Sequence, residues 1–345
     1  MDGDGILQPV TLSRHNSTSP KKQSFIPRNH WAKLALGVAF AQCIIACILE
    51  FYILITNQSY LASIDFPNPI DKGKATALLG YYILFLVAQV YQLLLLMDAL
   101  MQLSLIQLVT TTTFNWLFFG YSIVQYFQAA GIVVPLLTPN PHPTKTMEIL
   151  LSVVMLFFAV SGSFLCWKLY YVFGWTTYKE LGADITVRNV LYLYHIYILL
   201  LKLDVFFFFS VQFQFIFLNV QPGTNFSPAV NMIVSSIGAL GLLILAYFAV
   251  RKESQYLVYG TLVAFVVGIG YLFTNLEKIW FSQKVLYSSS KNSFTLLIIA
   301  TIILSVVTMA VAVLNMQKFG QGLINRLAST TTVIDEESHA FEVRR

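Results

Sequence analysis

The chain has 345 residues, of which 57% are hydrophobic and only 11% are charged, and its formal net charge is +5. Ordinary soluble domains carry roughly 25% charged residues, so this composition excludes a typical soluble globular protein. The basic residues are spread over helix ends and tails and form no single patch, which argues against a nucleic-acid partner. The lipid bilayer is the predicted surrounding of most of the surface.

The first 32 residues are polar and predict a disordered cytosolic tail, because they contain too little apolar surface to fold. Within this tail Ser19 precedes Pro20 in a sequence typical of a proline-directed kinase site, and an unmodified tail is the alternative. The first apolar run is too long for the core of a cleavable signal peptide. We therefore expect it to act as an uncleaved membrane anchor.

Eight apolar runs follow, each close to the ~20 residues that a membrane-spanning helix requires. We place them at 34–56, 76–98, 103–128, 148–173, 189–218, 229–250, 255–276 and 294–316. The third is the least apolar, and without it the count falls to seven. The predicted fold class is all-α, a polytopic transmembrane helix bundle of about eight spans. Residues 33–317 form one helical domain with no apparent internal repeat, and 318–345 form a second disordered cytosolic tail.

The distribution of Lys and Arg predicts the orientation of the bundle. With both termini on one side, that side collects 14 of these residues and the opposite side 6, so both termini are predicted to be cytosolic. The sequon at Asn57 then falls in the first lumenal loop, as a candidate glycosylation site close to a helix end.

The familiar motifs of hydrolases, P-loop proteins and dinucleotide-binding enzymes are absent, so we expect no enzyme activity and no catalytic residue. The three cysteines lie inside apolar runs, where they are expected to act as small packing residues. We predict no metal site and no cofactor.

Ionisable residues inside the membrane are costly, and they are usually paired or functional. The fifth run contains His195, Lys202 and Asp204; the first two share a helix face, and Lys202 and Asp204 point to nearly opposite sides. Glu50 in the first run is the predicted partner of Lys202, because both lie roughly 21–25 Å from the cytosolic surface. Asp98 lies near a helix end, where it is expected to reach water. The cluster of Glu50, His195, Lys202 and Asp204 is either a binding or proton-coupled path, or a set of structural ion pairs.

A polar stripe follows the third run, and the second run adds two glutamines. Such side chains either line a cavity or connect helices through hydrogen bonds worth ~0.6 kcal/mol each. The residues concerned are Gln89, Gln92, Gln107, Thr111, Asn115, Ser122, Gln125 and Tyr126.

The loop Tyr178-Lys179-x-x-Gly182-Ala-Asp184, followed by Lys202-x-Asp204 in the next helix, resembles a fungal family of Golgi apparatus membrane proteins with no established activity. The resemblance extends over about residues 30–320. It implies a multi-pass location in the Golgi membrane and supplies no catalytic residue. In the loop, Asp184 is suited to cap the start of the fifth helix on the cytosolic side.

Four functions remain open, of which a membrane enzyme acting on lipid or glycan is the least supported. The first is a non-enzymatic Golgi or endomembrane protein acting in trafficking, sorting or organisation, with unknown protein partners bound through the cytosolic tails. The second is a small-solute or proton-coupled transporter that uses the intramembrane charges. The third is a seven-helix receptor-like protein with its N-terminus outside the cytosol. Another endomembrane or the plasma membrane is the alternative to the Golgi address.

Overall fold

A computed structural model describes residues 29–62, 69–133, 144–181, 185–219, 227–281 and 291–319, for a few helix ends as backbone only. These residues form eight α-helices and no strand. The helices are α1 (His30–Ala62), α2 (Pro69–Met101), α3 (Leu105–Val133), α4 (Lys145–Leu181), α5 (Ile185–Asn219), α6 (Ser227–Arg251), α7 (Gln255–Phe281) and α9 (Lys291–Met316). All eight predicted helices are therefore present. The predicted tails fall mainly on residues 1–28 and 320–345, outside the described residues.

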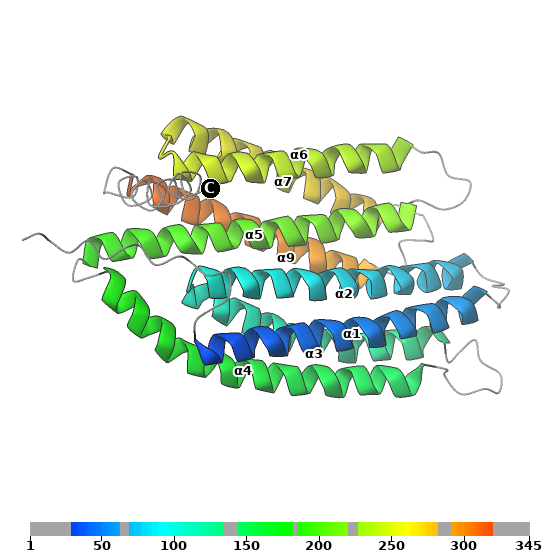
Figure 1. The fold of residues 1–345 in the computed structure, drawn as a ribbon. Coiled ribbons are helices and arrows are strands. Elements are labelled where there is room, and N and C mark those ends of the chain that lie inside the picture. Colours follow the sequence, from blue (N-terminus) through cyan, green and yellow to red (C-terminus); the bar gives the residue numbers. More distant parts are fainter. Residues whose placement is uncertain are drawn as a thin grey trace, which may run out of the picture.

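Six of the described helices are long and apolar enough to cross a membrane, and α6 contributes a shorter apolar segment. Helix α3 falls below that level of apolarity because of its polar stripe, but its 29 residues span roughly 43 Å and pack between α2 and α4. The third run is thus a full member of the bundle. Helix α1 begins and α9 ends at the same end of the molecule (Figure 1), as an even number of antiparallel spans requires.

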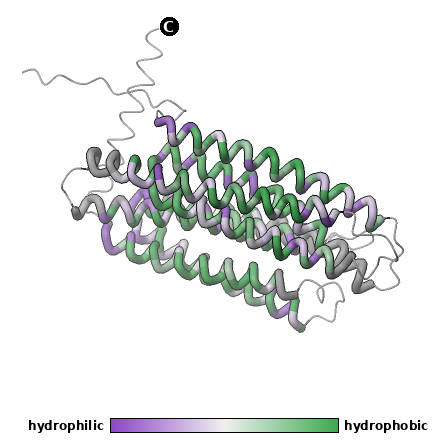
Figure 2. Tube along the Cα trace, turned by 90° about the horizontal axis from the view of Figure 1, so that it is seen from below, coloured by the Kyte–Doolittle hydropathy of each residue, from purple (hydrophilic) through white to green (hydrophobic). Residues whose placement is uncertain are grey.

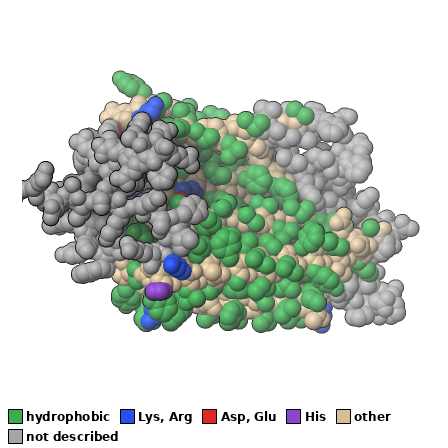
Figure 3. Space-filling view, in the orientation of Figure 1, with side chains coloured by type: hydrophobic (Ala, Val, Ile, Leu, Met, Phe, Trp, Pro, Cys, Tyr) green, Lys and Arg blue, Asp and Glu red, His purple; other side chains and the backbone are tan. Residues whose placement is uncertain are grey.

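The surface between the two ends is apolar. Hydrophobic residues predominate along the helices and hydrophilic residues gather mainly toward their ends (Figure 2). One face is covered by apolar side chains, while the basic side chains visible there lie mainly toward the ends (Figure 3). Large apolar residues such as Phe157, 65% exposed, point outward. Lys168 lies 4.6 Å from the ring centroid of Trp167, as expected where aromatic residues meet the lipid headgroups.

The eight helices form two groups of four. In the first half, α1 packs on α2, α2 on α3, α3 on α4 and α4 on α1; in the second, α5, α6, α7 and α9 close the same ring. Figure 1 shows α1–α4 below and α5–α9 above, with α2 and α5 side by side between them. These two helices form the main contact between the halves, which we call the seam.

The two halves contain matching turns. Leu103 between α2 and α3 and Glu253 between α6 and α7 have φ of 51° and 48°. The next amides, of Ser104 and Ser254, donate to carbonyl oxygens five residues earlier at 3.0 and 3.1 Å. This left-handed residue followed by a hydrogen bond back into the helix is a Schellman-type helix end. The predicted third run therefore began too early, because 102–104 form this turn.

The buried positions of the two halves also recur, 150 residues apart. Thr144, just before α4, and Glu148, Leu151, Met155, Phe158 and Leu165 in α4 are buried, and so are Phe294, Ile298, Thr301, Ser305, Thr308 and Asn315 in α9. Thr111 and Thr261, in α3 and α7, are both buried and donate to the carbonyl three residues earlier. The chain thus contains an internal structural repeat, which the sequence analysis missed because most of the matched buried positions hold different residue types.

Candidate functional site

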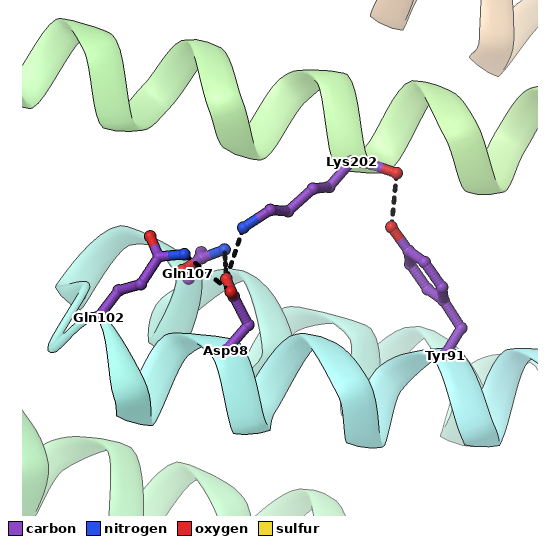
Figure 4. A network of polar contacts seen from close by, with 5 residues as sticks. All are labelled: Tyr91, Asp98, Gln102, Gln107 and Lys202. Atoms are coloured by element: carbon purple, nitrogen blue, oxygen red, sulfur yellow. Dashed lines mark hydrogen bonds and ion pairs between the residues drawn. The ribbon is translucent and has the colours of Figure 1, made fainter. Parts of the chain in front are cut away.

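An ion pair crosses the seam between the halves (Figure 4). Lys202 Nζ of α5 lies 2.5 Å from Asp98 Oδ2 of α2. The same carboxylate accepts hydrogen bonds from Gln107 Nε2 at 2.6 Å and from Gln102 Nε2 at 2.7 Å. Three donors therefore surround one carboxylate whose side chain is 33% exposed. Asp98 is an anchor point of the seam as well as partly exposed, so the prediction that it simply reaches water was incomplete.

Tyr91 of α2 reinforces this seam. Its hydroxyl donates to the backbone oxygen of Lys202 at 2.5 Å, and its ring stacks on Phe206 with centroids 4.7 Å apart. His195 of α5 is half-buried and lies within electrostatic range of Lys202 and Asp98. The common face of His195 and Lys202 stays a prediction.

The predicted pairing of Glu50 with Lys202 was wrong. Glu50 is fully buried, and both of its oxygens accept from Gln125 Nε2, at 2.9 and 3.1 Å. Helix α1 packs mainly on α2 and α4, whereas α5 meets α2 from the other half. Similar depth in the membrane therefore did not make the two side chains neighbours.

A second buried network lies between α1, α2 and α4. Asn57 Nδ2 donates to the Tyr82 hydroxyl at 2.7 Å, and Thr144 Oγ1 contacts Asn57 Oδ1 at 3.1 Å and Glu148 Oε1 at 2.9 Å. Asn57 has no exposed surface and lies inside α1. Its prediction as a glycosylation acceptor is therefore contradicted, because the side-chain amide already forms hydrogen bonds in the interior.

A third network joins α1, α2 and α3. Gln42 Nε2 donates to Asn115 Oδ1 at 2.8 Å and reaches Gln89 and Gln92 at 3.4 Å, and Gln92 also donates to Asn115. A cavity of only about 40 Å³ adjoins them. The predicted polar stripe thus includes an interhelical network, to which Gln42 adds a member that the sequence analysis missed. On the same stripe, Thr111 and Ser122 are buried, while Tyr126 is half-buried.

Asp204 faces the second half, opposite to Lys202 as predicted. It is 1% exposed, and its carboxylate accepts from Thr308 Oγ1 at 2.6 Å and from Ser305 Oγ at 3.4 Å, both on α9. Among the described residues Asp204 forms no ion pair. It is therefore a buried carboxylate held by hydroxyl groups alone.

A cavity of about 520 Å³ adjoins Asp204 between α5, α6, α7 and α9. This volume lies within the range of roughly 300–1,000 Å³ that is usual for ligand pockets. Its polar lining groups include Asp204 and Ser305, and its wall contains Gly238, Gly260 and Gly268. A methyl group added at any of these glycines would meet no atom within 4 Å. The cavity therefore has open space beside Asp204, the one buried carboxylate among the described residues of this half.

The cavity reaches the membrane-facing surface. Val263 and Val267 line it and are 65% and 69% exposed. Both lie in α7, among apolar side chains that face lipid in a spanning helix. A ligand can therefore approach the cavity sideways from the hydrocarbon region of the bilayer.

The predicted cytosolic loop is shorter than expected. Tyr178 and Lys179 belong to α4, which continues to Leu181 and bends toward the start of α5 (Figure 1). Gly182 and Asp184, and the candidate phosphorylation site Ser19, lie outside the described residues. The proposed cap by Asp184 therefore stays a prediction.

Comparison with known proteins finds one related membrane protein. The chain is similar to a UPF0658 Golgi apparatus membrane protein of Schizosaccharomyces pombe, with 25% identity over 268 residues. The match covers 70% of this chain and 75% of the relative. The resemblance to fungal Golgi membrane proteins is confirmed. With it, the predicted multi-pass location in the Golgi membrane is supported.

No protein-family model matches the sequence. No solved structure matches it either. The relative's name gives a membrane location and no activity.

Proposed function

We propose that this Golgi membrane protein is a non-enzymatic carrier that binds a small lipophilic solute in its second half. The observation that carries this proposal is the cavity of about 520 Å³ between α5, α6, α7 and α9. Its wall is apolar apart from a few groups, which is the usual character of small-molecule sites. The exposed flank of α7 supports loading from the bilayer.

The arrangement in two halves also supports a carrier. Many secondary transporters consist of repeated helical units that move against each other, in some cases with parallel orientation. Here each unit has four helices, an even number, so both units start at the same side of the membrane. The seam centres on α2 and α5, with the ion pair of Asp98 and Lys202 near its predicted cytosolic end. Such a limited contact is compatible with rocking between the halves.

Two of the other hypotheses are less well supported by the described residues. A seven-helix receptor needs one helix fewer than the eight that the structure describes. Recruitment of protein partners by the tails concerns residues 1–28 and 320–345, outside the described residues, and stays a prediction.

The proposal is tested by filling the cavity. We expect the purified full chain in lipid nanodiscs to bind an uncharged environment-sensitive lipophilic dye saturably. Gly268→Leu places a large side chain in open space and should weaken dye binding by about tenfold or more. Gly120→Leu is the matched control, because Gly120 is also helical and unobstructed but lies on the lipid-exposed surface of α3. Equal dye binding by both variants and the wild type would refute the proposal.

A further inference from the structure

We propose that the solute bound in the second half is a lipophilic amine whose ammonium group pairs with Asp204. This inference rests on the proposed carrier function and specifies its ligand class. It joins two observations, the buried carboxylate on the cavity wall and the apolar space that opens toward the bilayer.

The charge of the site favours a cation. A carboxylate removed from water is costly unless it is paired, and hydroxyl donors compensate only part of that cost. Asp204 receives hydrogen bonds from Thr308 and Ser305, which fix both oxygens in place. The neighbouring Lys202 is committed to Asp98 on the other side of α5. No described side chain forms an ion pair with Asp204, and a cationic ligand would supply the missing counter-ion.

The walls of the cavity suit an organic ammonium ion. Phe208, Phe265 and Tyr271 line the same space as Asp204. Aromatic faces attract cations, and their effect grows where water is excluded. An alkyl or aryl body attached to the nitrogen would replace water against the apolar lining, at roughly 25 cal/mol per Å² of apolar surface buried.

The position of Asp204 disfavours the common phospholipids as ligands. It is residue 20 of the 35 in α5, roughly 28 Å along the helix from Ile185 and near its middle. A phospholipid headgroup stays at the membrane surface, and its phosphate would be repelled by the carboxylate. A compact single amine that partitions into the bilayer can reach this depth.

The inference is tested with three ligands that share one chain and differ in the headgroup: decylamine, decanol and decanoate. The wild-type chain in nanodiscs should bind decylamine at least about tenfold more tightly than decanol, as measured by displacement of the lipophilic dye. Decanoate should bind most weakly, because its carboxylate meets that of Asp204. Equal displacement by the amine and the alcohol would overturn the charge assignment.

Two variants complete the test. Asp204→Asn keeps the shape and should remove the preference for the amine while leaving decanol binding intact. Asp98→Asn is the matched control, because this carboxylate faces the seam, and it should leave the preference unchanged. If Asp204→Asn does not fold, the melting temperature of the wild-type chain is compared with each ligand. Decylamine should raise it more than decanol, and an equal rise would contradict the inference. If decylamine and decanol bind equally well and Gly268→Leu weakens both, the amine specificity is wrong and the carrier function stands. If neither ligand binds in a way that depends on Gly268, the proposed carrier function is wrong.

Discussion

The two halves of this protein share a ring of four helices, a matching turn and the same buried register, yet their interiors differ. The first half is filled by hydrogen-bonded networks around Gln42, Glu50 and Asn57, beside a cavity of only about 40 Å³. The second half contains a cavity of about 520 Å³ beside Asp204 that opens toward the bilayer. One backbone arrangement thus supports a tightly connected half and an open half. We infer that the first half is the rigid support and the second the ligand-binding part.

The largest expected effect is in the first half. Glu50→Ala should lower the free energy of unfolding by about 3 kcal/mol, because it leaves a void and strands the buried donor of Gln125. The free energy is measured by denaturant titration in mixed micelles. Glu277→Ala is the control, since Glu277 is exposed on α7 and its loss should change little. If Glu50→Ala lowers the free energy of unfolding as little as the control does, the first half is not a rigid support.

A smaller effect distinguishes two glycines. A methyl group at Gly162 would lie 2.7 Å from Asn115 Nδ2, whereas one at Gly268 would meet nothing within 4 Å. Gly162→Ala should therefore cost about 1–2 kcal/mol by displacing the amide network, while Gly268→Ala should be neutral or slightly stabilising. The same titration measures both variants. Equal changes in the two would show that the halves do not differ in packing.

The seam is expected to contribute less again. Lys202 and Asp98 are 28% and 33% exposed, so their pairing should be only partly strengthened by burial. We expect a coupling energy of about 1 kcal/mol in the double-mutant cycle of Lys202→Met and Asp98→Asn. The prediction fails if the two single costs simply add, because the ion pair would then contribute nothing to the contact between the halves.

Much of the fold could be predicted from the sequence, because lipid demands long apolar helices and leaves few alternatives. All eight helices were predicted, and so was the divergence of Lys202 and Asp204, which follows from helical geometry alone. The partners could not be predicted, because depth along a helix says nothing about which helix lies beside it. Glu50 was therefore assigned to Lys202 although Gln125 holds it.

The internal repeat and the cavity could not be predicted from the sequence for a related reason. Met155 and Ser305 occupy matching buried positions but share no chemistry, so the repeat leaves only a weak trace in the residue types, such as Thr111 and Thr261. Gly238, Gly260 and Gly268 are ordinary residues of membrane helices, and their gathering on one cavity wall depends on how α6 and α7 rotate. The carboxylate of Asp98 could have been considered as a partner for Lys202 from the sequence, although it lies close to a helix end.

The last prediction is that no glycan is attached to Asn57, so that the molecular mass of the chain does not change. Asn57 is enclosed by Tyr82 and Thr144 in the first half, so an oligosaccharide could be attached only before that half folds. The full chain expressed in a eukaryotic cell should therefore show no Asn57-dependent mobility shift after endoglycosidase treatment, with Asn57→Gln as the reference. The same variant should still lower the free energy of unfolding by about 1 kcal/mol, because it displaces two buried hydrogen bonds. A glycan on Asn57 in the folded protein would contradict the burial of this side chain between Tyr82 and Thr144.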